Sequence, residues 1–133
     1  MAVTIGRMAR LRLPLCALLL AAVATLGLTP AAHAAPTRCK SADLRYPFMP
    51  DGPKTFGVFK LGITGGTCKQ AHRVARAWMA EFELELLLGR VKLPRKVAGF
   101  AFKSLPPTAA QTYNERGRKG ATTIRFDYTV PNG

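Results

Sequence analysis

The sequence is short of the residues from which metal sites are built. Its 133 residues include only two histidines and three cysteines. Cys16 and His33 fall in an N-terminal segment that we expect to be removed, which leaves Cys39, Cys68 and His72. These three side chains are fewer than the four ligands of a structural zinc site. We therefore expect no metal site and no cofactor.

The motifs of nucleotide binding and nucleophilic catalysis are also missing. Gly62, Gly65 and Gly66 are not followed by the Gly-Lys-Ser/Thr ending with which a phosphate loop holds phosphate and metal. Ser41 and Ser104 stand outside any nucleophile-elbow pattern. The sequence therefore gives no support for a nucleotide site or a serine nucleophile.

The remaining catalytic candidates have weak support. His72 would need a nucleophile or a carboxylate brought to it, and the sequence indicates no such partner. Glu81, Glu83 and Glu85 suggest the carboxylate pair of a glycoside hydrolase. On a helix, however, Glu81 and Glu85 share a face while Glu83 points away. We interpret them as a solvated acidic stripe and predict that the protein is not an enzyme.

The first part of the chain has the pattern of an export signal. A basic start, an apolar run and small residues at a peptidase site follow one another: Arg7, Arg10 and Arg12, then residues 13–28, then Ala32 and Ala34. The apolar run is short for a membrane span, which needs about 20 residues. We expect cleavage between Ala34 and Ala35, so that residues 1–34 are a signal peptide and residues 35–133 form one secreted domain. The alternative is a retained N-terminal anchor.

Acidic residues are scarce, and the domain after the signal is therefore strongly basic. All 7 acidic residues and 17 of the 20 basic ones follow Ala34. This domain also keeps two cysteines, Cys39 and Cys68, which are 29 positions apart. An even cysteine count in an exported chain favours a disulfide, and these two can pair with each other in one way only. Two free thiols are the alternative.

An apolar stripe at helical spacing predicts one long helix. Its members recur three and four positions apart: Ala71, Val74, Ala75, Trp78, Met79, Phe82 and Leu86. The helix should follow the break at Gly65 and Gly66, with Thr67 as its N-cap. It should end near Leu88, because Gly89 suits the position after a helix C-cap.

The other segments predict strands of an antiparallel sheet. Strand-like patterns occupy residues 55–63, 97–103 and 122–130, with a short segment at 44–48 that its proline places at an edge. In the first of these, Phe59, Leu61 and Ile63 should share one face. Residues 114–120 are polar and contain glycine, which is typical of a hairpin tip. The predicted fold class is α+β, with one long helix packed on a three- to four-stranded, mainly antiparallel sheet.

One pattern extends over most of the chain after the signal. It consists of Cys39, the turn Gly65-Gly66-Thr67-Cys68, the helix start 71–75, Gly99-Phe100 and Ile124-Arg125-Phe126. In these residues the chain resembles a loose group of small exported, uncharacterised proteins of high-GC bacteria. Such proteins often have a second cysteine pair later in the chain. This chain lacks that pair, because no cysteine follows Cys68. The resemblance implies export and a disulfide-containing α+β fold, and it implies no activity.

Two basic segments are the candidate binding residues. One contains Arg90, Lys92, Arg95 and Lys96, and the other contains Arg116, Arg118 and Lys119. A small domain with this charge is attracted to polyanions, and outside the cell these are envelope polymers, anionic lipid headgroups or nucleic acid. The basic segments contain no interleaved aromatic residues on which bases could stack, so nothing favours nucleic acid over the other polyanions.

We therefore expect a monomeric, non-enzymatic protein that associates with anionic cell-surface polymers. A simpler interpretation is that the basic charge only keeps the protein soluble. The alternative function is a secreted inhibitor or protein-interaction module that presents residues 92–96 or 114–120 as an exposed loop.

Overall fold

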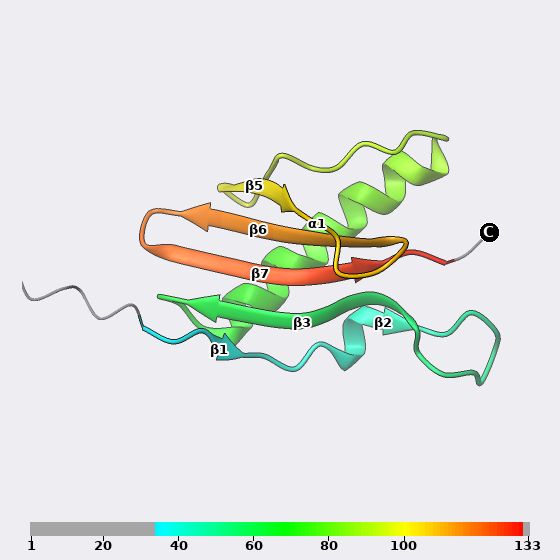
Figure 1. Ribbon diagram of the computed structural model, residues 1–133, viewed down its shortest axis with the longest axis horizontal. Helices are drawn as coiled ribbons and strands as arrows, with labels where there is room; N and C mark the ends of the chain where they lie inside the picture. Colours follow the sequence, from blue (N-terminus) through cyan, green and yellow to red (C-terminus); the bar gives the residue numbers. More distant parts are fainter. Residues whose placement is uncertain (1–33, 132–133) are drawn as a thin grey trace, which may run out of the picture. The chain divides into compact units, whose positions relative to one another are not determined.

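The computed structural model describes residues 34–131 of the chain (Figure 1). The predicted signal peptide lies outside the described residues except for Ala34, and Ala34 and Ala35 are exposed. The elements are β1 (Thr37–Arg38), a 3-10 helix η1 (Ala42–Leu44), β2 (Arg45–Tyr46), β3 (Phe56–Thr64), α1 (Cys68–Leu87), β4 (Lys96–Val97), β5 (Phe100–Leu105), β6 (Thr112–Lys119) and β7 (Thr122–Thr129).

Helix α1 begins and ends as its sequence predicts. The Thr67 side chain accepts a hydrogen bond from the Gln70 backbone N–H, which satisfies one of the unpaired donors of the first turn. At the other end Gly89 has a positive φ of 70°. The Gly89 and Arg90 N–H groups donate to the carbonyls of Leu86 and Glu85, which is the Schellman arrangement.

The strands form one antiparallel sheet of the order β1-β3-β7-β6-β5-β4, with β2 also paired to β3. The class α+β is as predicted, but the prediction of three to four strands was wrong, because the sheet has seven. The predicted edge segment 44–48 contains β2. Two of the three extra strands, β1 and β4, are two-residue pairings that leave no periodic signal. The third is β6, whose charged residues and Gly117 gave it the composition of a hairpin tip; the turn that joins it to β7 is Gly120-Ala121.

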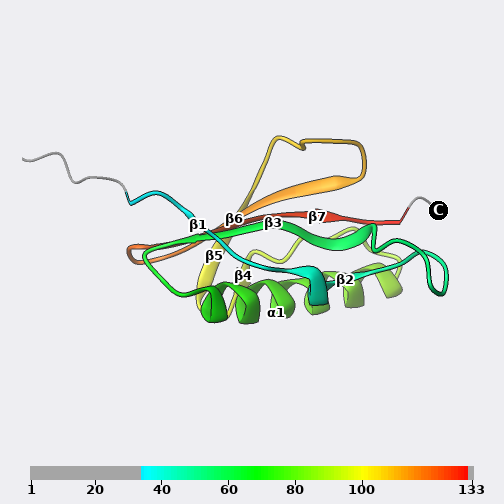
Figure 2. The same cartoon turned by 90° about the horizontal axis from the view of Figure 1, so that it is seen from below.

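Helix α1 lies across one face of the sheet and leaves the other face without a covering layer (Figure 2). Trp78 is the centre of the core and is fully buried. Its ring lies 5.2 Å from Phe82, 5.2 Å from Phe126 and 5.5 Å from Tyr128. Among residues 34–131, the buried hydrophobic residues all lie between Leu44 and Tyr128. A chain that begins at Ala35 therefore keeps this whole core, as a domain that folds by itself requires.

A bulge in β3 corrects the predicted orientation of Phe59. Val58 pairs with Tyr128 and Phe59 with Asp127, and the register then shifts before Gly62 pairs with Arg125. Lys60, inside the bulge, has a positive φ of 51°. An extra residue in one strand changes which side chains face the core. Val58, Leu61 and Ile63 are therefore buried, while Phe59 lies on the opposite face under the Arg45 guanidinium, 4.3 Å from its ring centroid.

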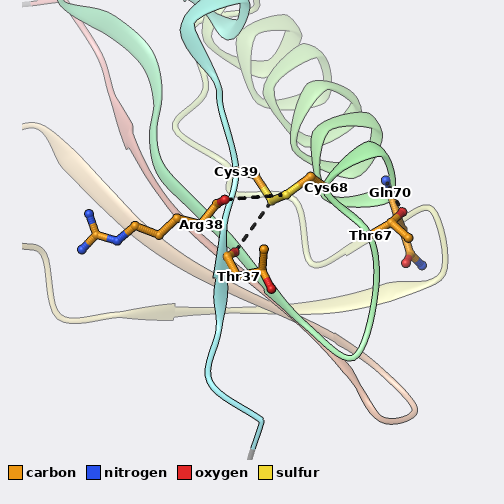
Figure 3. The surroundings of a disulfide bond; sticks show 6 residues. All are labelled: Thr37, Arg38, Cys39, Thr67, Cys68 and Gln70. Atoms are coloured by element: carbon orange, nitrogen blue, oxygen red, sulfur yellow. Dashed lines mark hydrogen bonds between the residues drawn. A yellow bond between two sulfur atoms is a disulfide. The ribbon is translucent and has the colours of Figure 1, made fainter.

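The predicted disulfide is present between Cys39 and Cys68 (Figure 3). Cys39 follows β1 and donates its backbone N–H to the Leu61 carbonyl of β3, and Cys68 is the first residue of α1. The bond therefore fastens the edge of the sheet to the start of the helix. Within the described residues, no helix is both long and apolar enough to cross a membrane.

Removal of this bond should lower stability measurably. The double variant Cys39→Ser/Cys68→Ser loses a constraint on a loop whose ends are 29 positions apart, which is worth about 3–4 kcal/mol in the chain-entropy model. Urea unfolding of the domain from Ala35 onward, oxidised and as the double variant, measures the difference. Alkylation of the untreated wild-type protein is the control, and free thiols there would contradict the pairing.

Glu115 is a buried carboxyl on the helix side of the sheet. It is 1% exposed and accepts a hydrogen bond from the Ser104 hydroxyl at 2.7 Å. Burial raises the pKa of Glu115 above its ordinary value of 4.5, although the Ser104 hydrogen bond and the charge of Arg95 oppose the shift. The fold therefore favours the protonated form, and its contribution to stability is lost as the pH rises above 4.5.

The variant Glu115→Gln should be more stable than the wild type at neutral pH, because it removes a charge that the fold disfavours. The gain should disappear near about pH 3, where the wild-type carboxyl is itself neutral. Thermal unfolding as a function of pH measures it, with Glu81→Gln at an exposed helix position as the control. A gain that does not depend on pH would show that the charge of Glu115 is not the cause.

Candidate functional site

The face of the sheet that α1 does not cover is the candidate site. Ile124, Phe126 and Tyr128 of β7 are buried on the helix side. Successive side chains of a strand point to opposite faces, so Arg125 and Asp127 point to the other one. Pairing then assigns the neighbouring strands, because residues directly opposite each other share a face. We call this surface the open face.

A row of cations crosses the open face from strand to strand. Lys103 of β5 pairs with Arg116 of β6, and Arg116 pairs with Arg125 of β7. Arg125 pairs with Gly62 of β3, which in turn pairs with Arg38 of β1. Since neighbouring strands lie about 4.8 Å apart, the backbone positions of the first three residues follow one another at about 5 Å, and that of Arg38 lies about 10 Å further on. We call Lys103, Arg116, Arg125 and Arg38 the basic row.

Gly62 stands between Arg125 and Arg38 in this row and is buried. A Cβ atom at Gly62 would meet only the Thr37 carbonyl oxygen, at 3.4 Å, which is at the edge of ordinary contact. Packing therefore does not force a glycine at this position.

A second line of positions extends the charge toward the end of the sheet where β6 turns into β7. Arg118 pairs with Ala101 of β5 and with Thr123 of β7, and Ala101 pairs with Lys96 of β4. Arg118 and Lys96 are exposed. The open face is therefore basic over about half of its length.

The carboxylates that could neutralise these cations are engaged elsewhere. Within the described residues, no carboxylate oxygen lies within 4.0 Å of the basic row. The carboxylate of this face, Asp127, is only 6% exposed. It lies 2.8 Å from the Lys60 ammonium and accepts a hydrogen bond from Thr108, in the loop 106–111 between β5 and β6. Figure 2 shows this loop on the side of the sheet opposite α1, so it contacts the open face at Asp127.

The structure separates the seven predicted anion-binding residues. Arg116, Arg118 and Lys96 lie on the open face. The other four lie elsewhere. Arg90 pairs with Glu85, and the Lys119 ammonium lies 5.9 Å from the Phe100 ring. Lys92 and Arg95 line a hollow of about 250 Å³ with Glu81 and Glu85, and Lys96 also borders this hollow.

Three residues of the basic row were not singled out from the sequence. Arg38 follows the predicted cleavage site, Lys103 ends a predicted strand, and Arg125 alternates with buried residues of the last strand. The alternation alone placed Arg125 outward, but only the strand pairing shows that Lys103, Arg116 and Arg38 share its row. The segment 114–120, predicted as a hairpin tip, is mostly strand.

Two further polar clusters lie on the helix side. The sequence indicated no carboxylate partner for His72, but the fold supplies one. Asp43 Oδ2 lies 2.6 Å from His72 Nε2 and 3.1 Å from the Arg76 guanidinium. The hydrogen bond from His72 is the main cause that lowers the pKa of Asp43, and Arg76 adds to it. The cluster fastens η1 to the helix. The hydroxyl of Ser41, the residue before η1, does not join this cluster, because it donates to the Val58 carbonyl.

The second cluster joins Glu83 to two phenols. Tyr46 and Tyr128 both donate to Glu83 Oε1, the latter at 2.6 Å, and their hydroxyls lie 2.9 Å apart. Burial, aided by the bond to Glu83, raises the pKa of Tyr46 to about 12 and also raises the pKa of Tyr128. Both phenols therefore stay protonated, and they tie β2 and β7 to the helix.

Comparisons of this chain with protein-family models, with curated proteins and with solved structures find no match. In residues 34–131, no three His, Cys, Asp or Glu side chains are grouped closely enough to hold a metal ion. The geometry of the open face is therefore the observation on which a function can be argued.

The basic row should cost the protein stability. Like charges that lie directly opposite in adjacent strands are destabilising, by about 0.2–1 kcal/mol for each pair. Arg116 is opposite both Lys103 and Arg125, so Arg116→Gln should raise the free energy of unfolding at low salt. The gain should shrink as salt screens the charges. Urea unfolding at low and high salt measures it, with Arg73→Gln on the helix as the control, and an equal gain in both variants would contradict it.

Proposed function

We propose that this protein is a small exported domain that binds a linear anionic polymer of the cell envelope across the open face of its sheet, without catalysing a reaction. The observation that carries the proposal is the basic row itself. Three of its four cations stand side by side on adjacent strands, on the face that α1 does not cover, and among the described residues no carboxylate oxygen lies within 4.0 Å of them.

The arrangement fits a ligand with repeated charges. A fold that keeps like charges directly opposite one another loses stability, and a bound polyanion removes that repulsion. Arginine forms bidentate bonds with phosphate and carboxylate, and three of the four residues of the row are arginines. Since the cations follow each other across the strands, the polymer lies across the strands too.

The compartment is part of the same proposal. The Cys39–Cys68 disulfide fits an oxidising environment outside the cytosol. The basic start, apolar run and small residues up to Ala34 supply the export signal, in keeping with the resemblance to small exported proteins. The polymers that such a domain meets are those of the cell surface.

Binding to inorganic polyphosphate, a simple linear polyanion, tests the proposal. The variant Lys103→Gln/Arg116→Gln/Arg125→Gln should bind at least tenfold more weakly than the wild type, because each lost contact also removes a released counterion. The matched control is Lys69→Gln/Arg73→Gln/Lys92→Gln, which removes the same charge away from the open face and should lower the affinity much less. Titration calorimetry at several salt concentrations measures both.

The salt dependence distinguishes a site from a diffuse attraction. The logarithm of the affinity should fall with the logarithm of the salt concentration, and the slope should be shallower for the row variant than for the control. Equal affinities and equal slopes for the two triple variants would show that only the net charge matters, and the proposed site would then be wrong.

A further inference from the structure

The exposed apolar side chains of the described domain are concentrated at one end. Six large hydrophobic residues are exposed between residues 34 and 131, namely Phe48, Met49, Leu84, Leu87, Leu88 and Val91. The first two lie in the turn between β2 and β3, and the others lie in the last turn of α1 and just after it. Single exposed apolar residues are ordinary, but a concentration of this kind marks a contact surface.

The fold brings both segments to the same end. Tyr46 of β2 donates a hydrogen bond to Glu83 of α1, so the turn that follows Tyr46 and the helix end that follows Glu83 leave from neighbouring points. Both figures show the turn 47–55 and the end of α1 at the end of the domain opposite the hairpin 120–121 (Figures 1 and 2). We call this end, with its six residues, the apolar end.

The side chains of the apolar end protrude, and they form two separate groups. Leu87 is 85% exposed and Val91 is 70% exposed, while Phe48 in the other group is 66% exposed. The Schellman arrangement turns the chain at Gly89, and the pair Arg90–Glu85 takes the place where an apolar contact usually closes this motif. Leu87, Leu88 and Val91 are therefore left facing outward.

The occupant that fits two separate protrusions is a lipid bilayer. A protein partner must match a continuous surface by shape, whereas acyl chains and headgroups rearrange around each inserted side chain. Lys54 lies near the first group, and Arg90 and Lys92 lie within or beside the second. Apolar side chains with neighbouring cations are the elements of an interfacial membrane contact, and the surplus of basic residues attracts the domain to anionic lipid.

We propose that the apolar end dips into the surface of an anionic bilayer and holds the domain there peripherally. The contact uses Leu84, Leu87, Leu88 and Val91 on one side and Phe48 and Met49 on the other. It rests on the position of these side chains and does not depend on the polymer proposed for the open face.

Co-sedimentation with vesicles tests this contact. The oxidised domain from Ala35 onward, which contains the whole core, is mixed with vesicles of phosphatidylcholine with or without phosphatidylglycerol. It should bind the anionic vesicles, and a fraction should remain bound at about 1 M salt, where the Debye length is about 3 Å and apolar contacts persist. Leu87→Ser/Leu88→Ser should lower this salt-resistant partition at least tenfold, because two exposed leucines no longer leave water. Phe48→Ser/Met49→Ser should lower it as well.

The matched control is Arg116→Gln/Arg125→Gln on the open face, which should keep the salt-resistant binding. The single tryptophan, Trp78, is fully buried, so its fluorescence verifies that each variant is folded. Equal partition of the wild type and Leu87→Ser/Leu88→Ser would overturn the proposal. A dimer in sedimentation that this variant dissociates, with no vesicle binding by the wild type, would overturn it too and would make the apolar end an interface between two copies. Loss of polyphosphate binding alone would leave the membrane contact intact.

Discussion

The fold depends on the packing of one helix against one face of the sheet. Trp78 makes the central contact, with aromatic rings of β5 and β7 around it. Burial of these rings is the largest favourable contribution that a domain of about a hundred residues can obtain. A single helix can cover only one face, however, and the described residues contain no second α-helix to cover the other. The open face must therefore be compatible with water.

That requirement explains why charge could gather on the open face. Alternation places every second residue of β5, β6 and β7 on the open face. Asp127 and Thr112 are buried there, but at the exposed positions polar residues cost nothing in packing. Opposite charges would have satisfied the same requirement with a gain in stability. The basic row instead keeps like charges opposite one another, while Glu115 is turned to the helix side and Asp127 is occupied by Lys60. This departure from the stable arrangement is what a binding site for a polyanion requires.

The local features of the sequence predicted local structure well. The apolar stripe, Thr67 and Gly89 located α1, and the compartment argument paired Cys39 with Cys68. The predictions that failed concern features that are set by contacts between segments distant in the sequence. Residues 112–119 form a strand because β5 and β7 flank them, although their composition resembles a turn. Phe59 faces outward because of a bulge that no periodicity reveals. The basic row is a property of strand register, so the sequence showed its members only as scattered cations.

The two proposed surfaces are related by the direction of the strands. β3 begins at Phe56, at the apolar end, and reaches the basic row at Gly62. At about 3.3 Å for each residue, the row lies roughly 20 Å from that end. A domain held in a bilayer by Leu87, Leu88 and Phe48 would thus stand with its strands upright, and the row, which crosses the strands, would run parallel to the membrane. A polymer bound there would be held along the membrane and clear of the lipid headgroups. The proposed contact at one end would therefore give the open face a defined height and orientation, which neither surface could provide alone.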